Sequence, residues 1–347
     1  MRVIQVAHKF PPHPGGIEYH VMELSEFLVE RGVEVLVLTT TPESYPQKFP
    51  FRVYRFKPLA EPLRNPISFK LALQFRKLAK GSIAHLHSPY TFSTLLTYPF
   101  ADKAVITLHG RPYYEGVFRS LAKVHEKVSI TLTKGAHFIS LTELDASYLK
   151  AMGVPEERIH VIPNFVNVER LQSLVKGVEV GHAYDLLYVG GLVEAKGLDQ
   201  LVRDLSELGV SLAIIGKGPL RKRLEELAEG LGAKVHFLGA LPREKVIRAY
   251  LSARAVILPS RSEGFPTVVL EALSIGRPVI LSDIMVHRRL FKDVALLYKP
   301  GDPLSLREAI FSLDSFSPEK AVRFVRENYD IRVVGPKVLS LYKSIWE

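Results

Sequence analysis

Short runs of β-branched and other apolar residues alternate along the chain with stretches whose apolar residues recur every three or four positions. The first run covers 3–7, and the stretch behind it places Val21, Leu24 and Leu28 on one helical face. Strands that alternate with amphipathic helices are typical of a parallel, doubly wound α/β sheet. The other strands that we predict are 33–39, 51–56, 83–87, 104–108, 137–140, 158–162, 184–189, 213–215, 235–238, 255–258 and 278–281.

The pattern divides the chain into two series of strands and helices. A chain of 347 residues is longer than one hydrophobic core usually organises, which favours two domains. Periodicity weakens over 163–183, so we place the connection early in that stretch. The prediction is two Rossmann-like, doubly wound domains, 1–165 and 166–330, facing a central cleft. A helix over about 331–347 is expected to pack back on the first domain.

Composition narrows the class of protein without selecting one. With 47% hydrophobic and 24% charged residues, the chain is globular rather than disordered. It has no cysteine, which excludes disulfides, thiolate metal sites and cysteine nucleophiles. Its first residues read as a strand rather than a leader, and no apolar run approaches the roughly 18 residues of a membrane span. We therefore expect a cytoplasmic protein, either soluble or peripheral on the membrane.

The net charge of +10 is concentrated in one segment. Residues 48–80 contain nine Lys or Arg, among them Lys70 and Lys77, against a single acid, Glu61. Such a patch attracts an anionic partner: a phospholipid surface, a phosphorylated acceptor or nucleic acid. A basic face that is merely solvated is an equally good interpretation. No nucleic-acid-binding motif accompanies the charge, so we expect no nucleic-acid partner.

A second basic face is predicted on the helix that follows the strand at 104–108. Arg119, Lys123 and Lys127 share one side of this helix, and its apolar residues share another. One interpretation lays the helix on an anionic membrane. The interpretation that we favour packs its apolar side on the sheet, because every doubly wound fold needs such helices. The apolar residues concerned are Val117, Leu121, Val124 and Val128.

Residues that could bind a ligand or act in catalysis are most concentrated over 258–283. Glu263 and Glu271 stand eight positions apart, and Gly264 and Pro266 between them indicate a loop that turns into a helix, with proline at the first helical position. A helix start presents unpaired N–H groups, so a diphosphate could rest there while the carboxylates take hydroxyls on either side. That arrangement describes a nucleotide-sugar site. Solvated glutamates on an ordinary amphipathic helix are the competing interpretation.

Glycine-rich turns follow several predicted strands. Gly15 and Gly16 permit a close approach of the backbone to a ligand at the carboxyl end of the sheet, with a simple Pro-Gly turn as the alternative. Lys196 stands just before a helix and could reach a phosphate held at a domain cleft. The loop from Gly216 begins as G-x-G but has Arg221 where a dinucleotide fingerprint needs its third glycine, which argues against a nicotinamide enzyme.

Histidines mark the carboxyl ends of two predicted strands. His109 follows one strand, precedes a glycine, and is placed to face a ligand. His85 and His87 stand two apart on another strand and so point to the same face of the sheet. Two histidines without a third ligand are weak evidence for a metal. We therefore interpret them as structural and expect no metal and no other cofactor.

Seven blocks of the sequence follow one another in a definite order: PPHPGGIEYHV, HLHSPY, VITLHG, VIPNFVNVERL, YVGGLVEAKGLDQLV, IIGKGPL and SRSEGFPTVVLEALSIGRPVI. In order and spacing they resemble retaining glycosyltransferases of family 4, which have the two-domain GT-B fold. The resemblance covers nearly the whole chain. The opening block is also similar to that of phosphatidylinositol N-acetylglucosaminyltransferases and lipid-linked mannosyltransferases, and it is shared too widely to select a donor.

The resemblance implies a role for each matching residue. Glu271 would bind the ribose hydroxyls, Glu263 and His109 would hold the transferred sugar at the reacting centre, and Lys196 would neutralise the leaving group. Backbone positions would surround the donor phosphates, although Pro266 has no N–H to offer. The backbone positions are Gly15, Gly16, Gly264, Phe265, Pro266, Thr267 and Val268.

The chain departs from the family pattern at one donor-binding position. The family often has arginine where this chain has Gly191, which leaves one phosphate cation unaccounted for. Lys217 or Arg261 could substitute for it. The departure keeps open an alternative function, namely a catalytically silent sugar-nucleotide-binding or scaffold subunit of the same fold.

The resemblance also implies a mechanism and partners. A hexosyl group would pass with retention from a UDP-, GDP- or ADP-linked sugar to a glycan, lipid or small-molecule acceptor, through attack on the same face. Cations and helix N–H groups would stabilise the departing diphosphate, so neither a metal nor a protein nucleophile would be needed. A pyridoxal-phosphate phosphorylase and a nucleotide-sugar epimerase share the fold and are weaker alternatives. The residues expected on the acceptor or membrane side are Lys70, Lys77, Arg119, Lys123 and Lys127.

Overall fold

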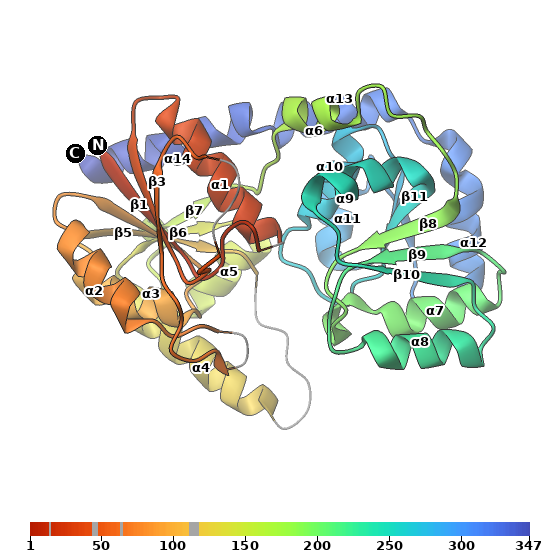
Figure 1. Ribbon diagram of the computed structural model, residues 1–347, viewed down its shortest axis with the longest axis horizontal. Coiled ribbons are helices and arrows are strands. Elements are labelled where there is room, and N and C mark those ends of the chain that lie inside the picture. Colours follow the sequence, from red (N-terminus) through yellow and green to blue (C-terminus); the bar gives the residue numbers. More distant parts are fainter. Residues whose placement is uncertain (14, 44–47, 63–64, 111–117) are drawn as a thin grey trace. The chain divides into compact units, whose positions relative to one another are not determined.

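The chain forms two compact α/β units, each built on one parallel sheet (Figure 1). Unit 1 consists of Met1–Phe165 with Ile331–Glu347, and unit 2 consists of Val166–Asp330. Of Phe118 and Arg119 only the backbone is described. The computed structural model describes residues 1–13, 15–43, 48–62, 65–110 and 118–347.

Unit 1 carries seven strands within its described residues, in the order β3-β2-β1-β4-β5-β6-β7. The strands are β1 (Arg2–Ala7), β2 (Glu34–Thr39), β3 (Arg52–Arg55), β4 (Ile83–His87), β5 (Lys103–Leu108), β6 (His137–Ser140) and β7 (Ile159–Val161). The helices are α1 (Gly16–Val29), α2 (Phe69–Leu78), α3 (Phe92–Thr97), α4 (Phe118–Thr133), α5 (Glu143–Ala151) and α14 (Ile331–Trp346). The strand order reverses between β1 and β4, and doubly wound sheets bind ligands at the carboxyl ends beside such a switch point.

Unit 2 repeats this plan with six strands in the order β10-β9-β8-β11-β12-β13, counted over its described residues. The strands are β8 (Tyr184–Val189), β9 (Leu212–Ile215), β10 (Val235–Gly239), β11 (Ala253–Leu258), β12 (Val279–Ser282) and β13 (Leu296–Tyr298). The helices are α6 (Val168–Val175), α7 (Leu198–Ser206), α8 (Arg221–Gly230), α9 (Arg243–Ala249), α10 (Thr267–Ser274), α11 (Met285–Phe291), α12 (Pro303–Phe311) and α13 (Pro318–Asn328). Its switch point lies between β8 and β11.

The central strands are buried on both faces, as the apolar runs predict for a parallel sheet covered by helices. Every residue of β4, β9 and β12 is buried. Local signals then set the helix starts: the Ser68 hydroxyl accepts from Leu71 N at the start of α2, and the Thr142 hydroxyl accepts from Asp145 N at the start of α5. The prediction of an α/β fold with two Rossmann-like units is confirmed.

The last helix, α14, follows unit 2 in the sequence but belongs to unit 1, where it runs beside α1 (Figure 1). The two helices approach closely at Gly335, because a Cβ added there would meet the Phe27 ring at 2.6 Å. Farther along, the Tyr342 hydroxyl is hydrogen-bonded to His85 Nδ1 of β4. These contacts tie the end of the chain to the switch point of unit 1.

The expectation that α4 packs its apolar side on the sheet is wrong for the residues that are described. On its inward side Ser129, Ile130 and Thr133 are buried, and the Thr133 hydroxyl donates to Ser129 O at 2.8 Å within the helix. His125 and Glu126 are hydrogen-bonded to Tyr90 on the same side, so polar residues take the place expected for the larger apolar ones. Val117 lies outside the described residues. The exposed apolar residues are Leu121 (66%), Val124 (61%), Val128 (48%) and Leu132 (62%).

Two smaller differences concern element boundaries. Pro266 is not the first residue of α10 but its N-cap, with an extended backbone (φ −79°, ψ 104°), and the helix begins at Thr267. The proline therefore ends the loop rather than starting the helix. The edge strand β13 is absent from the strands predicted above, because three residues, Leu296–Tyr298, are too few to show a periodic pattern.

Candidate functional site

The two glutamates singled out from the sequence lie at the carboxyl end of β11, beside the switch point of unit 2. Strand β11 is paired with β8 on one side and β12 on the other. The chain leaves β11 at Leu258, forms a loop through Glu263 and enters α10, which places Glu271 on the second turn of that helix. Both carboxylates are thereby attached to the part of the sheet where such folds bind ligands.

Glu263 is held by two neighbours before α10 begins. Its carboxylate forms an ion pair with the Lys196 ammonium, and its Oε1 accepts from Ser260 Oγ at 2.6 Å. The Glu263 side chain is 9% exposed and the Lys196 side chain 24% exposed. A partly exposed cation and a nearly buried anion therefore meet at the end of the sheet, and the carboxylate keeps lone pairs for a further donor.

Lys196 is positioned by a turn that is docked on the Glu263 loop. The turn Glu194–Lys196 ends at Gly197, whose left-handed backbone (φ +64°) suits glycine. A Cβ at Gly197 would meet Pro259 O at 2.4 Å, and Arg261 N donates to Ala195 O at 2.8 Å. The backbones of the two loops are therefore docked against each other, which brings the Lys196 side chain to the Glu263 loop.

Glu271 is nearly buried, and both of its oxygens have protein partners. Arg243 Nη1 lies 2.8 Å from Oε1, and the Tyr250 hydroxyl donates to Oε2 at 2.8 Å. Burial, with the Glu271 carboxylate alongside, raises the pKa of Tyr250 well above its usual value, so its hydroxyl stays a neutral donor. Arg243 and Tyr250 orient the carboxylate while each oxygen retains a lone pair for a ligand hydroxyl.

Two glycine loops from neighbouring strands lie side by side at the same end of unit 2. Leu192 N donates to Lys217 O at 3.0 Å, and the buried Tyr188 hydroxyl donates to Gly191 O at 2.8 Å. A Cβ added at Gly191 would meet nothing closer than Lys217 O at 4.0 Å, so a side chain fits there. A Cβ at Gly216 would instead overlap Gly190 O. Backbone contacts therefore exclude a side chain at Gly216 and also at Gly218, whereas Gly191 leaves room for one.

The two proposed substitutes for the family arginine are in different situations. Arg261 donates to Glu194 O at 2.8 Å and to Asp199 Oδ2 at 2.9 Å, so its guanidinium is already engaged. Lys217 is exposed on the loop beside Gly191. Lys217 is therefore the better placed of the two to meet a phosphate.

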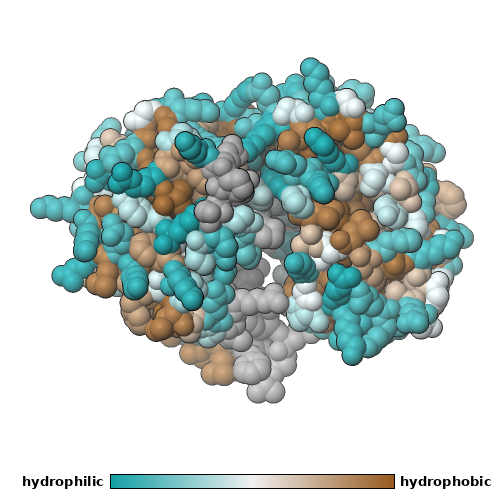
Figure 2. Space-filling view, in the orientation of Figure 1, coloured by the Kyte–Doolittle hydropathy of each residue, from teal (hydrophilic) through white to brown (hydrophobic). Residues whose placement is uncertain are grey.

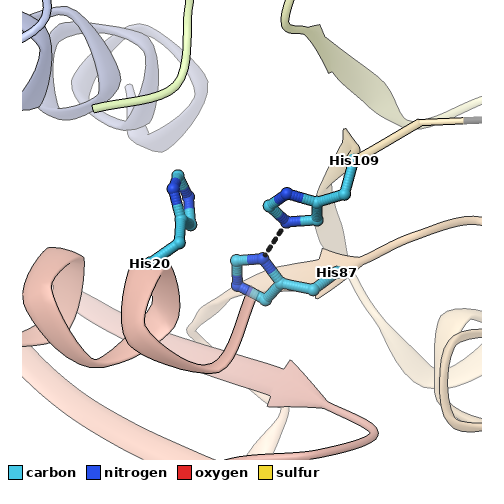
Figure 3. Close-up of side chains that lie close together, drawn as sticks. All are labelled: His20, His87 and His109. Carbon is cyan, nitrogen blue, oxygen red and sulfur yellow. Dashed lines mark hydrogen bonds between the residues drawn. The ribbon is translucent and has the colours of Figure 1, made fainter. Parts of the chain in front are cut away.

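His109 belongs to unit 1, where it joins a cluster of four histidines at the carboxyl ends of β4 and β5. The His109 ring stacks on His87 with centroids 5.2 Å apart, and the His85 ring centroid lies 4.3 Å from that of His87. His20 of α1 approaches His109 edge to face, at 4.9 Å (Figure 3). The prediction that His85 and His87 share one face of the sheet is confirmed.

Burial keeps this histidine cluster neutral. It lowers the pKa of His20 to about 4, and burial with the neighbouring His20 lowers the pKa of His85 to about 3. Burial and the adjacent imidazoles hold the pKa values of His87 and His109 well below the usual range. All four rings are therefore uncharged at neutral pH, and each can act as both a donor and an acceptor.

The remaining predicted residues are distributed over unit 1. Gly15 has an extended backbone and stands just before α1, with the Glu18 carboxylate folded back over it. The four lysines expected on the acceptor side are exposed. The side chain of Arg119 lies outside the described residues. The exposed lysines are Lys70, Lys77, Lys123 and Lys127.

Sequence reasoning missed the residues that hold the predicted ones in place. Arg243 and Tyr250 fix Glu271, Ser260 fixes Glu263, and Asn164 fixes His20. Asn164 stands in the block VIPNFVNVERL quoted above, which was the one available signal for it. Ser260 begins the block SRSEGFPTVVLEALSIGRPVI, three residues before its partner Glu263. Arg243 and Tyr250 carry no local pattern, because Glu271 is remote from them in the sequence.

The chain thus combines two doubly wound units, the second with a charged site beside its switch point. Two family profiles match the chain in succession. The profile described as Glycosyltransferase Family 4 matches residues 14–170, and the one described as Glycosyl transferases group 1 matches residues 174–330. The chain belongs to this family and is a glycosyltransferase.

Curated relatives match over most of their length. An uncharacterised glycosyltransferase of Methanocaldococcus jannaschii is 27% identical over 389 residues, covering 100% of this chain and 99% of the relative. A phosphatidyl-myo-inositol mannosyltransferase of Mycobacterium leprae is 27% identical over 371 residues, covering 96% and 94%. A D-rhamnosyltransferase of Pseudomonas aeruginosa is 26% identical and covers 85% and 82%. The names of the last two relatives state different sugars.

Solved structures share the fold at lower identity. Sucrose-phosphate synthase from Thermosynechococcus elongatus aligns with a TM-score of 0.78 at 20% identity, covering 99% of both chains. The Anabaena protein HepE in complex with UDP and glucose aligns with a TM-score of 0.77 at 16% identity, covering 99% of this chain and 100% of that one. At these identities the likeness establishes the fold alone.

Proposed function

We propose that the protein is a retaining glycosyltransferase that moves a hexosyl group from a nucleotide sugar to an acceptor hydroxyl. The observation that carries the proposal is the ion pair of Lys196 and Glu263 at the carboxyl end of the unit 2 sheet. The lysine is the cation that a departing diphosphate needs, and the glutamate is a carboxylate that can hold sugar hydroxyls. An ion pair that only stabilised the fold could lie elsewhere in the unit. This one lies at the carboxyl end of the sheet, where ligands bind in such folds.

Unit 2, Val166–Asp330, is the proposed nucleotide-sugar domain. Glu271 would accept from the ribose hydroxyls through the lone pairs that Arg243 and Tyr250 leave available. The diphosphate would lie at the start of α10, where the first helical N–H groups have no partner within the helix. The N–H groups proposed for this contact belong to Gly264, Phe265, Thr267 and Val268.

The phosphate cation that the family arginine supplies would here come from Lys217. It is exposed beside Gly191, whereas Arg261 is held by Asp199 and Glu194. A lysine is a point charge without the bidentate fork of arginine, so the substitution preserves charge but loses directional hydrogen bonding. Donor binding would then rely more on Lys196.

The proposed reaction needs no covalent link to the protein. The bond between the anomeric carbon and the donor phosphate breaks as the acceptor oxygen bonds to that carbon on the same face, and the departing phosphate takes the acceptor proton. Lys196 would meet the negative charge that develops on the phosphate. His109, held in a neutral cluster, would supply a hydrogen bond to the transferred sugar.

The experiment is product analysis. Purified protein would be incubated with UDP-, GDP- and ADP-linked hexoses and an acceptor panel containing phosphatidylinositol and isoprenoid-linked glycans, after a thermal-shift screen has ranked the donors. We expect one donor to yield a glycosylated product whose anomeric configuration matches that of the donor by NMR. An inverted product would contradict the retaining mechanism, and nucleotide-sugar hydrolysis without an acceptor product would contradict the transferase proposal.

A second candidate, a catalytically silent sugar-nucleotide-binding subunit, is favoured only by Gly191. The two candidates differ in one readout, because a silent subunit would show a donor-dependent thermal shift and no product. Lys196→Met separates them further: in a transferase, we expect turnover to fall by about 100-fold or more with a smaller change in donor binding. The exposed Lys222→Met is the matched control.

Unit 1, Met1–Phe165 with Ile331–Glu347, is the proposed acceptor side. Its helix α4 exposes the apolar residues Leu121, Val124, Val128 and Leu132, with Lys123 and Lys127 beside them. In the orientation of Figure 2, apolar surface appears along the lower edge of unit 1, where α4 runs in Figure 1. An exposed apolar stripe beside lysines fits the interface of an anionic bilayer.

Helix α2 supports the same proposal. Phe69 and Leu73 are 56% and 59% exposed on its outer side, next to the exposed Lys70 and Lys77. Over the described residues, none of the helices combines the length and apolar character that crossing a bilayer requires. We propose peripheral binding to the cytoplasmic face of a membrane, with a lipid-linked or otherwise anionic acceptor.

A further inference from the structure

Three imidazole rings from three different elements converge beside the switch point of unit 1. His20 comes from the second turn of α1, His87 is the last residue of β4, and His109 follows β5 directly. One nitrogen from each ring lies within 4.8 Å of the others (Figure 3). His20 and His87 are buried, and His109 is partly exposed, so the cluster can be reached from solvent through His109.

Hydrogen bonds on the outer side hold two of these rings in place. His20 Nδ1 lies 2.7 Å from Asn164 Oδ1, and His87 Nε2 lies 2.7 Å from Gln5 Oε1. Carbonyl oxygens can only accept, so both of these ring nitrogens carry hydrogens. His20 Nε2 and His87 Nδ1 are therefore lone-pair nitrogens, and the latter accepts from His109 Nε2 at 2.9 Å.

This pattern is the one that surrounds histidine metal ligands in proteins. A ligating histidine donates its other N–H to an oxygen, which fixes the tautomer and directs the lone pair at the metal. Gln5 and Asn164 supply that outer oxygen for two of the three rings. The other pair of stacked histidines, His137 and His160, is joined by a hydrogen bond of 3.0 Å and serves as a two-histidine comparison.

We propose that His20, His87 and His109 form a binding site for one divalent late transition-metal ion of the Zn²⁺ type. Three imidazoles with an open fourth position suit such ions, and the chain offers no thiolate to compete. Zn–N bonds of about 2.1 Å in tetrahedral geometry place ligand nitrogens about 3.4 Å apart. The 2.9 Å hydrogen bond between His87 and His109 would therefore open by about half an ångström.

Binding of the metal ion causes no net release of protons from the protein. The ion displaces the hydrogen on His109 Nε2, and that proton moves through solvent to His109 Nδ1, which leaves three neutral imidazoles and one metal. The fourth ligand is a water or an oxygen of a bound molecule. The site therefore forms without a charged protein ligand.

The test uses the untagged full chain, stripped of metal with a chelator and dialysed at equilibrium against Zn²⁺. We expect the wild type to bind one high-affinity Zn²⁺ per chain. His109→Ala and His20→Ala should weaken that binding by more than about 100-fold, because loss of an outer hydrogen bond alone costs 10–100-fold. The matched control, His160→Ala, disrupts the comparison pair and should leave the high-affinity Zn²⁺ in place.

A second measurement does not depend on the variants folding. Co²⁺ added to the wild type should give the intense visible absorption of a four-coordinate site, and Zn²⁺ should displace it with a stoichiometry of one. A weak, six-coordinate Co²⁺ spectrum in the wild type would overturn the proposal. Zn²⁺ affinity that is equal in His20→Ala and the wild type, with both folded by circular dichroism, would also overturn it.

One consequence rests on the proposed function. If His109 contacts the transferred sugar, a metal that occupies its ring should inhibit transfer, and a chelator should restore activity. The binding measurements use neither donor nor acceptor, so their failure would reject the metal site alone. Metal binding without inhibition would leave the site standing and count against the proposed role of His109.

Discussion

At the scale of single residues, unit 2 shows why the two glutamates cannot be exchanged for each other. Glu263 faces a lysine that is partly exposed, whereas Glu271 is nearly buried between an arginine and a tyrosine. Lys196 can leave the Glu263 carboxylate and pair with the phosphate of a bound donor. The Glu271 carboxylate is locked in orientation, which suits recognition of a group that does not react.

Glu271→Gln should weaken nucleotide-sugar binding. The ribose hydroxyls lose a charged acceptor, a loss of about 1.5–3 kcal/mol, and the ion pair of residue 271 with Arg243 is removed. Calorimetric titration of the donor found in the product assay measures the change. Glu226→Gln is the matched control, because Glu226 is an exposed glutamate of the same unit that pairs with Lys222. Equal donor affinity in wild type and Glu271→Gln would refute the ribose assignment.

The buried His20 makes stability depend on pH. Its pKa falls from 6.5 in the unfolded chain to about 4 in the fold, so between these values the unfolded state binds more protons. Stability from this group is complete above about pH 6.5 and is lost as the pH falls. Integration gives a loss of about 2 kcal/mol between pH 7 and pH 5.

Denaturant unfolding at pH 7 and pH 5, with chelator present, measures this loss. His20→Gln should show a smaller pH effect than the wild type, since glutamine does not titrate. His182→Gln, at an exposed histidine, should behave as the wild type does. A pH dependence that is the same in all three proteins would place the titrating group elsewhere.

At the scale of elements, loops and glycines determine where the reactive side chains lie. The Lys196 turn and the Glu263 loop dock through Gly197, and the glycine loops after β8 and β9 dock through Gly216. In each case a backbone carbonyl occupies the space of a side chain. The strands supply rigid starting points, and these loop contacts set the distance between the two charges.

Gly197→Ala should separate Lys196 from Glu263. Alanine at φ +64° is strained by about 1 kcal/mol, and its Cβ would additionally lie 2.4 Å from Pro259 O. Gly209→Ala is a matched control, because Gly209 has the same φ of +64° with no atom within 4 Å of the added Cβ. We expect similar strain in both variants but a further loss of stability and turnover in Gly197→Ala alone, by thermal unfolding and product assay. Similar turnover in the two variants would show that loop docking does not position the lysine.

At the scale of the whole molecule, charge and apolar exposure are concentrated in unit 1. The basic segment 48–80 and the outer side of α4 belong to this unit, and the carboxylates of the proposed donor site belong to the other. A requirement for solubility alone would not concentrate exposed apolar and basic residues on the same helices. A membrane that presents an anionic acceptor accounts for both features.

Binding to liposomes should therefore require anionic lipid and fall with salt. Each basic residue near such a surface contributes about 1 kcal/mol, and the field is screened over about 10 Å at 0.1 M salt. Co-sedimentation should show weaker binding when Lys70, Lys77, Lys123 and Lys127 are changed to glutamine. The control changes four exposed lysines of unit 2, namely Lys176, Lys222, Lys245 and Lys299. Equal partitioning to neutral and anionic liposomes would favour a soluble acceptor.

The sequence by itself determined the doubly wound fold, most of the strands, the capped helix starts at Ser68 and Thr142, and the family. These follow from local periodicity, from caps that act within three residues, and from motifs that are contiguous in the chain. The position of Glu263 before α10 was predictable for the same reason.

Only the tertiary structure decided which faces meet and which distant residues become partners. Periodicity shows that Leu121, Val124 and Val128 share a side of α4 but not that this side points away from the sheet. The partners of Glu271 come from segments remote in the sequence, and so does His20, which lies beside His87 and His109. Such contacts are set by how whole elements pack, and a local pattern carries no information about that packing.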